Sequence, residues 1–144
     1  MSPVLQGHFA DYAAFHRTPG NQACHYLGIP LIVMTLFALL SQVHLVTVGG
    51  YGITLAEVLF VLVSIYYLTL DATLALFMLA ASGALLYLGR HLDWTVALGL
   101  FVFGWILQFV GHYVYEKRSP AFYRNLTHLL VGPLWILAKA TGRD

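Results

Sequence analysis

Long apolar stretches separated by short polar breaks dominate this sequence. Four of them approach the roughly 20 apolar residues that a helix needs to cross a bilayer, and we expect spans near residues 28–48, 53–70, 72–89 and 94–114. The glycine-rich segment at residues 49–52 predicts a turn, and residues 90–93 form a polar break. Asp71 separates the second and third stretches without a glycine or proline, so a shallow or re-entrant pair is the alternative there.

Both ends of the chain differ from this apolar block. Residues 1–27 are polar and aromatic, and residues 115–144 begin with a basic segment. The apolar run 129–138 is too short to span a bilayer and contains Gly132-Pro133, so we interpret it as an interfacial or docking helix. The pattern predicts an all-α fold, a polytopic membrane helix bundle of about four transmembrane helices with interfacial helices at both ends. We expect residues 1–144 to form a single integral-membrane domain, with the transmembrane helices within residues 28–114.

Composition and charge support a membrane protein. Hydrophobic residues make up 60% of the chain and charged residues 9%, and the mean hydropathy is +0.78. Soluble domains carry roughly a quarter charged residues. The formal net charge of +1 argues against a nucleic-acid partner, which usually needs a basic surface. Because Cys24 is the single cysteine, no disulfide can form within the chain.

The lysine and arginine residues set the expected orientation. With four spans, both termini and the link at Asp71 share one side of the membrane, which then holds six Lys and Arg residues against Arg90 on the other side. Positive residues favour the cytoplasmic side, so we expect both termini in the cytoplasm. A bacterial inner membrane and the endoplasmic reticulum both fit this topology.

Four histidines fall on that same side, near one membrane boundary: His16, His25, His112 and His128. His16 and His25 flank the turn-forming sequence Thr-Pro-Gly-Asn, which can fold two short helical pieces back on each other. His112 and Glu116 stand at i and i+4 on one helical face, and a proline bend allows His128 to return to the same pocket. Imidazoles with at most one carboxylate suit iron, zinc, copper or nickel better than calcium or magnesium. The spacing therefore predicts a metal site.

Two segments resemble the signature segments of the 2-hydroxy fatty acid dioxygenase family: YAAFHRTPGNQACHYLGIPL at residues 12–31 and WILQFVGHYVYEKRSPAF at residues 105–122. They flank the apolar block in the family's order, so the resemblance covers nearly the whole chain. It implies a membrane-bound dioxygenase that uses Fe(II) as its cofactor and acts by α-oxidation without 2-oxoglutarate. Its substrates would be O2 and a long-chain 2-hydroxy fatty acid, which it would shorten by one carbon.

The resemblance also implies which residues act. His16, His25 and His112 match family histidines and Glu116 matches the family glutamate, so these four are expected to be catalytic, with the histidines binding the metal. We expect His128 to be the fourth metal ligand, and Glu116 either to orient the ligands or to bind the metal itself. Five further residues are expected to support the site or to meet the substrate: Tyr12, Asn21, Gln108, Arg17 and Lys117.

Two other classes of protein keep histidines at a membrane boundary. A metal or small-molecule transporter would use them as a binding site, but transporters usually bind near the midplane, whereas these histidines gather at one face. A structural membrane protein would keep them as interfacial hydrogen-bonding residues, which is the interpretation we give to His8, His44 and His91. The lipid bilayer is an expected partner in each case, and a homo-oligomer is left open.

Overall fold

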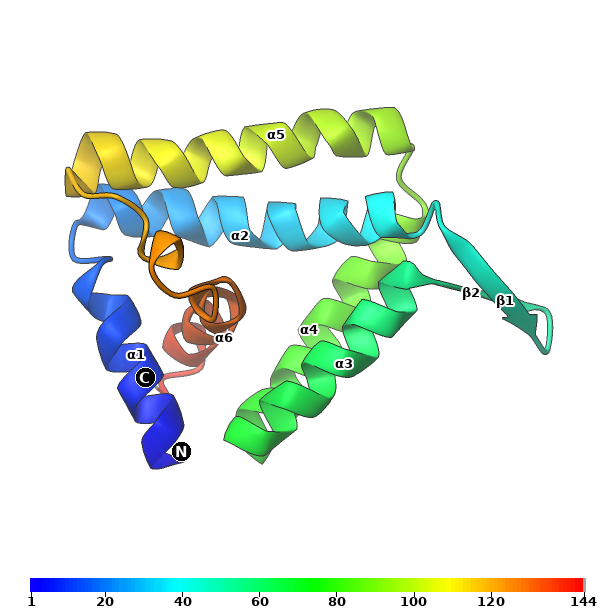
Figure 1. Ribbon diagram of the computed structural model, residues 1–144, viewed down its shortest axis with the longest axis horizontal. Coiled ribbons are helices and arrows are strands. Elements are labelled where there is room, and N and C mark those ends of the chain that lie inside the picture. The colour runs from blue at the N-terminus through cyan, green and yellow to red at the C-terminus, as the bar shows by residue number, and fades with distance from the viewer. Residues whose placement is uncertain (144) are drawn as a thin grey trace.

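Six α-helices account for most of residues 1–143, the part of the chain that the computed structural model describes (Figure 1). They are α1 (Pro3–Ala14), α2 (Pro19–Leu40), α3 (Leu55–Leu70), α4 (Ala72–Arg90), α5 (Trp94–Val110) and α6 (His128–Ala140). A π-helical segment η1 (Gly111–Glu116) continues α5, and a short 3-10 helix η2 (Ala121–Tyr123) precedes α6. Strands β1 (His44–Val48) and β2 (Tyr51–Thr54) form the small two-stranded sheet.

The long helix α2 begins nine residues before the predicted span. Thr18 caps it, because its hydroxyl oxygen accepts a hydrogen bond from the Asn21 N–H at 3.4 Å. Pro19 occupies the first turn, where the missing N–H has no helical partner to lose. This capped start places His25 inside the long helix rather than in a separate interfacial segment.

Residues 44–48, expected to complete the first span, form β1 and pair with β2 in an antiparallel hairpin. The helical prediction for these five residues was wrong. Gly49 and Gly50 both have positive φ, the backbone conformation that tight hairpin turns require. Once the chain reverses there, alternating valine and threonine side chains favour a strand over a continued helix.

Three helical segments within residues 1–143 are long and apolar enough to cross a membrane: Pro19–Leu40, Ala72–Arg90 and Trp94–Glu116. The predicted membrane helix bundle is therefore confirmed as a fold class. Helix α3 has 16 residues and is shorter than these segments, so a complete fourth span stays a prediction. The link to α4 is as tight as the sequence requires, because Asp71 ends α3 and caps α4 by accepting the Leu74 N–H at 2.9 Å.

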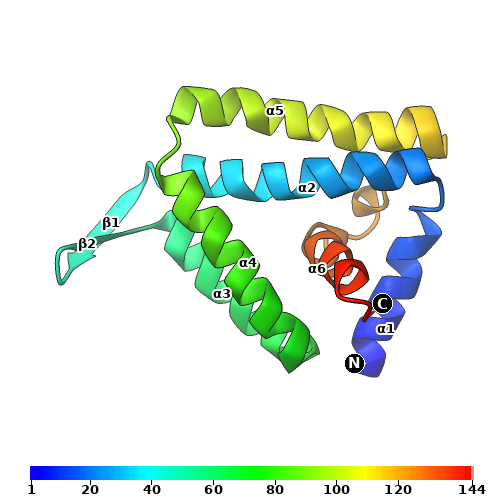
Figure 2. The ribbon, with the colours of Figure 1, turned by 180° about the vertical axis from the view of Figure 1, so that it is seen from behind.

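Helices α2 and α5 lie side by side along the long axis of the molecule (Figures 1 and 2). Glycines permit the close approach: a Cβ on Gly104 would lie 2.7 Å from Ile32 Cγ1 and 3.3 Å from the carbonyl oxygen of Gly28. Small residues bring helix backbones together in this way in membranes. The α3–α4 hairpin diverges from one end of the pair, whereas α1 and α6 lie near the other end, where α2 begins (Figure 1).

Helices α1 and α6 pack against the tip of the α3–α4 hairpin. Leu5, Tyr67 and Trp135 belong to one buried apolar cluster that joins these elements. The Tyr67 hydroxyl donates to the Leu130 carbonyl at 2.6 Å, and the N-terminal amine lies 3.2 Å from Asp71 Oδ2. The Asp71 link thus lies beside the N-terminus, which is the arrangement that the predicted topology requires.

A second set of polar contacts fixes the opposite end of the molecule. The Glu57 carboxylate accepts the Thr54 N–H at 2.7 Å, the Thr54 hydroxyl at 2.5 Å and the Tyr51 hydroxyl at 3.0 Å, and it forms an ion pair with Arg90. These bonds hold the hairpin against α3 and α4. His44, on β1, is exposed at this end of the molecule.

Candidate metal centre and adjoining cavity

The turn between α1 and α2 brings His16 and His25 together. His16 Nδ1 lies 2.7 Å from the Tyr12 carbonyl oxygen, and His25 Nδ1 lies 2.9 Å from the Asn21 carbonyl oxygen. Since a carbonyl oxygen only accepts hydrogen bonds, both Nδ1 atoms carry the proton and both Nε2 atoms carry a lone pair. Those two Nε2 atoms are 3.1 Å apart. Two lone pairs at this distance repel each other unless a proton or a cation lies between them.

His112, on the π-helical segment η1, completes the cluster. Its ring centroid lies 4.8 Å from that of His16 and 4.8 Å from that of His25, and its side chain is 2% exposed. Its Nδ1 is buried without a hydrogen-bond partner among residues 1–143. One ligand atom from each of the three histidines lies within 4.8 Å of the others.

These residues fit a metal ion. Metal–nitrogen bonds of about 2.0–2.1 Å place neighbouring ligand nitrogens roughly 3.0–3.4 Å apart, and the His16–His25 pair already has this spacing. Metal-binding histidines usually donate their second ring N–H to a carbonyl or carboxylate, as His16 and His25 do here. The arrangement therefore favours a metal over a proton between the rings.

The protonation state of His16 agrees with this interpretation. Burial, together with the neighbouring His25, lowers the pKa of His16 from 6.5 to about 3. The imidazole is therefore neutral at physiological pH, which is the form that binds metal ions.

Glu116 supports the cluster through the backbone and side chains of the neighbouring turn rather than through the imidazole rings. Its carboxylate accepts the Arg17 N–H at 3.0 Å, the Thr18 N–H at 3.0 Å, the Thr18 hydroxyl at 2.8 Å and the Asn21 side-chain N–H at 3.1 Å. These donors form the turn between His16 and His25. Glu116 thus ties the chain segment that carries His112 to the turn that carries the other two histidines.

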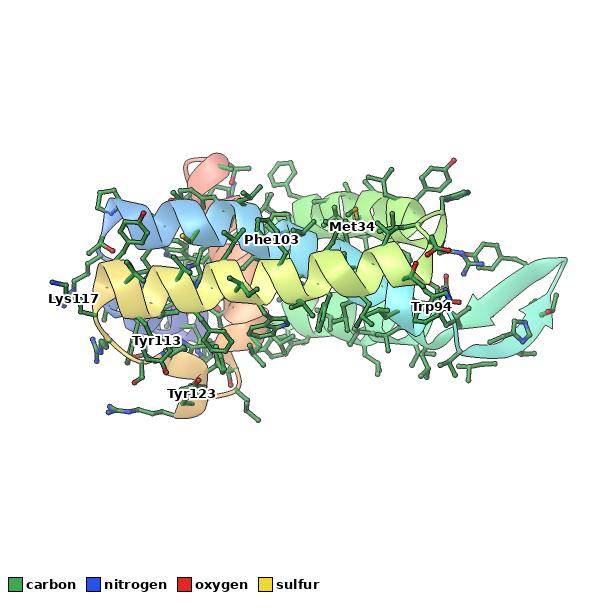
Figure 3. The ribbon with its side chains drawn as sticks, turned by 90° about the horizontal axis from the view of Figure 1, so that it is seen from above. Met34, Trp94, Phe103, Tyr113, Lys117 and Tyr123 are labelled. Atoms are coloured by element: carbon green, nitrogen blue, oxygen red, sulfur yellow. The ribbon has the colours of Figure 1, made fainter. Side chains whose placement is uncertain are left out.

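The remaining predicted supporting residues divide into two groups. Tyr12 stacks on His16 with ring centroids 3.9 Å apart, and Gln108 donates to the Cys24 carbonyl at 3.4 Å across the α2–α5 contact. Arg17 and Lys117 have exposed side chains and do not line the cavity described below; Figure 3 shows Lys117 at one end of the molecule.

His128 lies near the cluster but outside it. Its side chain is 5% exposed, its ring lies 5.6 Å from that of Tyr12, and its Nε2 is 2.7 Å from Asp11 Oδ2. The three-histidine group does not include it. Sequence reasoning did not single out Asp11, because a polar residue on an interfacial helix has no motif of its own.

A cavity of about 340 Å³ opens from the histidines into the apolar interior. His16, His25, His112 and His128 line it with Tyr12 and Gln108, and the rest of its wall is mostly apolar. Its α2 wall, from His25 to Phe37, covers about 18 Å at 1.5 Å per residue. One leaflet of a bilayer is about 15 Å deep, so the cavity can hold a chain of membrane-lipid length.

The apolar lining was not predicted, although α2 carried a signal for it. Residues at positions 25, 29, 32, 33, 36 and 37 line the cavity and follow the spacing of one helical face. In a membrane helix the lipid-facing side is also apolar, so periodicity does not separate the two faces. Trp105 and Phe122 contribute to the wall from elements distant in sequence and meet at a ring-centroid distance of 5.7 Å.

Comparison with known proteins agrees with this geometry. The model of a family described as 2-hydroxy-palmitic acid dioxygenase Mpo1-like matches residues 3–144. The chain is 36% identical over 138 residues to the 2-hydroxy-palmitic acid dioxygenase MPO1 of Saccharomyces cerevisiae (strain ATCC 204508 / S288c), covering 92% of this chain and 77% of the yeast protein. No solved structure matches the chain.

Proposed function

The chain belongs to the Mpo1-like family of 2-hydroxy-palmitic acid dioxygenases, and on that premise we propose that it is a membrane dioxygenase of long-chain 2-hydroxy fatty acids. It uses O2 to cleave the bond between the first and second carbons and releases a fatty acid one carbon shorter, with the first carbon leaving as CO2 and the remaining hydrogen and oxygen as water. The observation that carries this proposal is the cavity, which has histidines at one end and apolar walls along the rest. This shape matches a molecule with a polar head and a long apolar tail.

The metal is proposed to be Fe(II), held by His16, His25 and His112, and it would supply the redox chemistry through which O2 and the 2-hydroxy acid react. The neutral imidazoles offer three nitrogen ligands, and a site with few protein ligands leaves positions open for substrate. The backbone carbonyls of Tyr12 and Asn21 fix the ring orientations through the Nδ1 hydrogen bonds. Tyr12 covers one face of His16 and keeps water from it.

Glu116 is proposed to act as a positioning residue. It bonds to the turn rather than to substrate or metal, and its four donors determine how the His16 segment meets α2. His128, the expected fourth metal ligand, has its Nε2 bonded to Asp11 and lies outside the three-histidine group. The apolar wall of the cavity binds the acyl tail, so the carboxylate and hydroxyl are presented to the histidine end.

We also propose that both termini and the histidine end face the cytoplasm, on the evidence of the lysine and arginine distribution. The acyl tail of a substrate then enters from the surrounding lipid and its head stays at the membrane boundary. Oxygen, which is apolar, reaches the same depth through the bilayer.

The test is to offer 2-hydroxypalmitate and palmitate to the iron-loaded protein in detergent under isotopically labelled O2. We expect the 15-carbon acid from 2-hydroxypalmitate, with labelled oxygen in its carboxyl group, and little turnover of palmitate. A site that engages a hydroxyl rejects the analogue lacking it, by as much as roughly 10⁴-fold in favourable cases. Equal turnover of the two acids, or a shortened acid without labelled oxygen, would refute the proposal and favour a metal or small-molecule transporter.

A further inference from the structure

The pair formed by His128 and Asp11 lies outside the three-histidine group. His128 begins α6 and lines the cavity, whereas Asp11 lies on α1, and its side chain is 56% exposed. The two are 117 residues apart in sequence, and His128 Nε2 lies 2.7 Å from Asp11 Oδ2. A buried imidazole is thus joined to a carboxylate at the surface.

This contact determines which nitrogen of His128 carries the proton. A carboxylate only accepts hydrogen bonds, so the Nε2 of His128 is the donor. In the neutral imidazole, Nδ1 is then an unprotonated acceptor. This Nδ1 is buried and has no hydrogen-bond partner among residues 1–143. A buried acceptor without a partner is destabilising, so a ligand that donates a hydrogen bond to it gains affinity.

The surroundings of His128 limit what that donor can be. Aromatic rings enclose it, with the Tyr12 ring centroid at 5.6 Å and the Phe15 ring centroid edge-on at 6.0 Å. A 2-hydroxy fatty acid in the cavity offers a carboxylate, which accepts hydrogen bonds, a tail without polar groups, and one hydroxyl hydrogen. The hydroxyl is therefore the single group of the bound acid that can satisfy an unprotonated Nδ1.

We propose that His128, held in one tautomer by Asp11, accepts the hydrogen of the substrate's 2-hydroxyl and contributes to the preference for 2-hydroxy acids over unsubstituted acids. This inference rests on the proposed function for its substrate class. It assigns His128 to the substrate, in place of the expected role as fourth metal ligand. The hydroxyl oxygen keeps its lone pairs while its hydrogen is bonded, so the same group remains free for a second contact.

The test compares ligand binding, measured without oxygen so that no turnover occurs, in the iron-loaded wild-type protein and four variants. His128→Leu removes the acceptor and keeps the ring's volume approximately filled. His128→Asn restores an amide oxygen at a similar distance from the backbone. Asp11→Ala removes the carboxylate that fixes the tautomer of His128. Because Asp11 is exposed, this substitution should disturb folding least. His91→Leu is the control, because His91 is an exposed histidine outside the cavity.

We measure the dissociation constants of palmitate and 2-hydroxypalmitate, together with the iron content of each preparation. In His128→Leu, the preference for 2-hydroxypalmitate should fall by about 2- to 10-fold, the effect of one net hydrogen bond, while iron content stays at the wild-type level. Asp11→Ala should lose part of the preference, His128→Asn should recover part of it, and His91→Leu should keep all of it.

Three results would overturn the inference. Loss of iron in His128→Leu would assign the residue to the metal, and equal weakening of both acids would assign it to the carboxylate. An unchanged preference for 2-hydroxypalmitate in both His128→Leu and Asp11→Ala would show that the pair takes no part in recognising the hydroxyl. These outcomes are separate from the proposed function, which fails if the wild-type protein binds 2-hydroxypalmitate and does not oxidise it.

Discussion

Replacing Glu116 by glutamine tests whether the site depends on the link between the two ends of the chain. The substitution keeps the shape of the side chain and removes its charge. The best orientation of the new amide places its oxygen at the Oε2 position, where it still accepts from Thr18 and Asn21 and keeps the longer contact with the Arg17 N–H at 3.2 Å. Its NH2 group then stands at the Oε1 position, 3.0 Å from the Arg17 nitrogen, where two donors face each other.

The size of the effect follows from these contacts. Hydrogen bonds to a charged acceptor contribute about 1.5–3 kcal/mol each and neutral ones about 0.5–1.5 kcal/mol. The contact of the Arg17 N–H with Oε1 is lost and the four contacts at Oε2 are weakened, but the carboxylate is partly exposed, so solvent screens part of the difference. We expect a loss of about 1–3 kcal/mol in the free energy of unfolding. Metal affinity should fall by about 10- to 100-fold, as is typical when a residue that positions ligands is changed.

Glu57→Gln is the matched control for this experiment. Glu57 also accepts a backbone N–H and hydroxyl groups, and it pairs with Arg90, but it lies at the opposite end of the molecule. Thermal unfolding of the metal-free proteins and iron titration of each variant give the two quantities. Both substitutions should lower stability, and Glu116→Gln should weaken iron binding much more. If the two variants lose iron affinity equally, global stability explains the effect and the positioning role is refuted.

Two further predictions concern the histidine cluster itself. His16→Ala and His112→Ala should each lower iron content sharply relative to His44→Ala prepared identically, because His44 lies outside the cluster; equal loss in all three proteins would place the metal elsewhere. Burial lowers the pKa of His16 from 6.5 to about 3, so the unfolded chain binds a proton that the folded chain excludes. The contribution of neutral His16 to the stability of the metal-free protein should therefore be fully present above pH 6.5 and be lost as the pH falls from about 6.5 towards 3. A His16→Leu variant should show a shallower decline in unfolding temperature over this pH range.

Much of this architecture follows from local rules that a sequence exposes. Apolar run length and the capping residues Thr18 and Asp71 account for the long helices and for the tight α3–α4 link. The turn between His16 and His25 follows from its Thr-Pro-Gly-Asn sequence. The hairpin at residues 44–54 was missed because apolar β-branched residues are equally compatible with the end of a membrane helix.

The candidate site shows where sequence reasoning stops. Motif spacing brought out the three clustered histidines, because His16 and His25 flank a turn-forming sequence and His112 stands four residues before Glu116. It did not reveal that the Glu116 carboxylate turns to the Arg17–Thr18 backbone, or that His128 pairs with Asp11. Both contacts join residues about one hundred positions apart, and their geometry depends on how whole helices pack. No local pattern encodes that packing.

The hydrogen bonds of Glu116 join residues far apart in sequence, which has a consequence for biosynthesis. The residues that it bonds lie 95 to 99 positions earlier, so a ribosome has made His16 and His25 long before it makes their partner. Chains are synthesised from the N-terminus at about 5–20 residues per second, and contacts between distant residues form late in folding. The first two imidazoles therefore precede their partner by several seconds, the time in which α3, α4 and α5 are synthesised. A chain that stalls before residue 112 therefore lacks the third histidine of the cluster, and incorporation of the proposed iron would report that synthesis has passed this point.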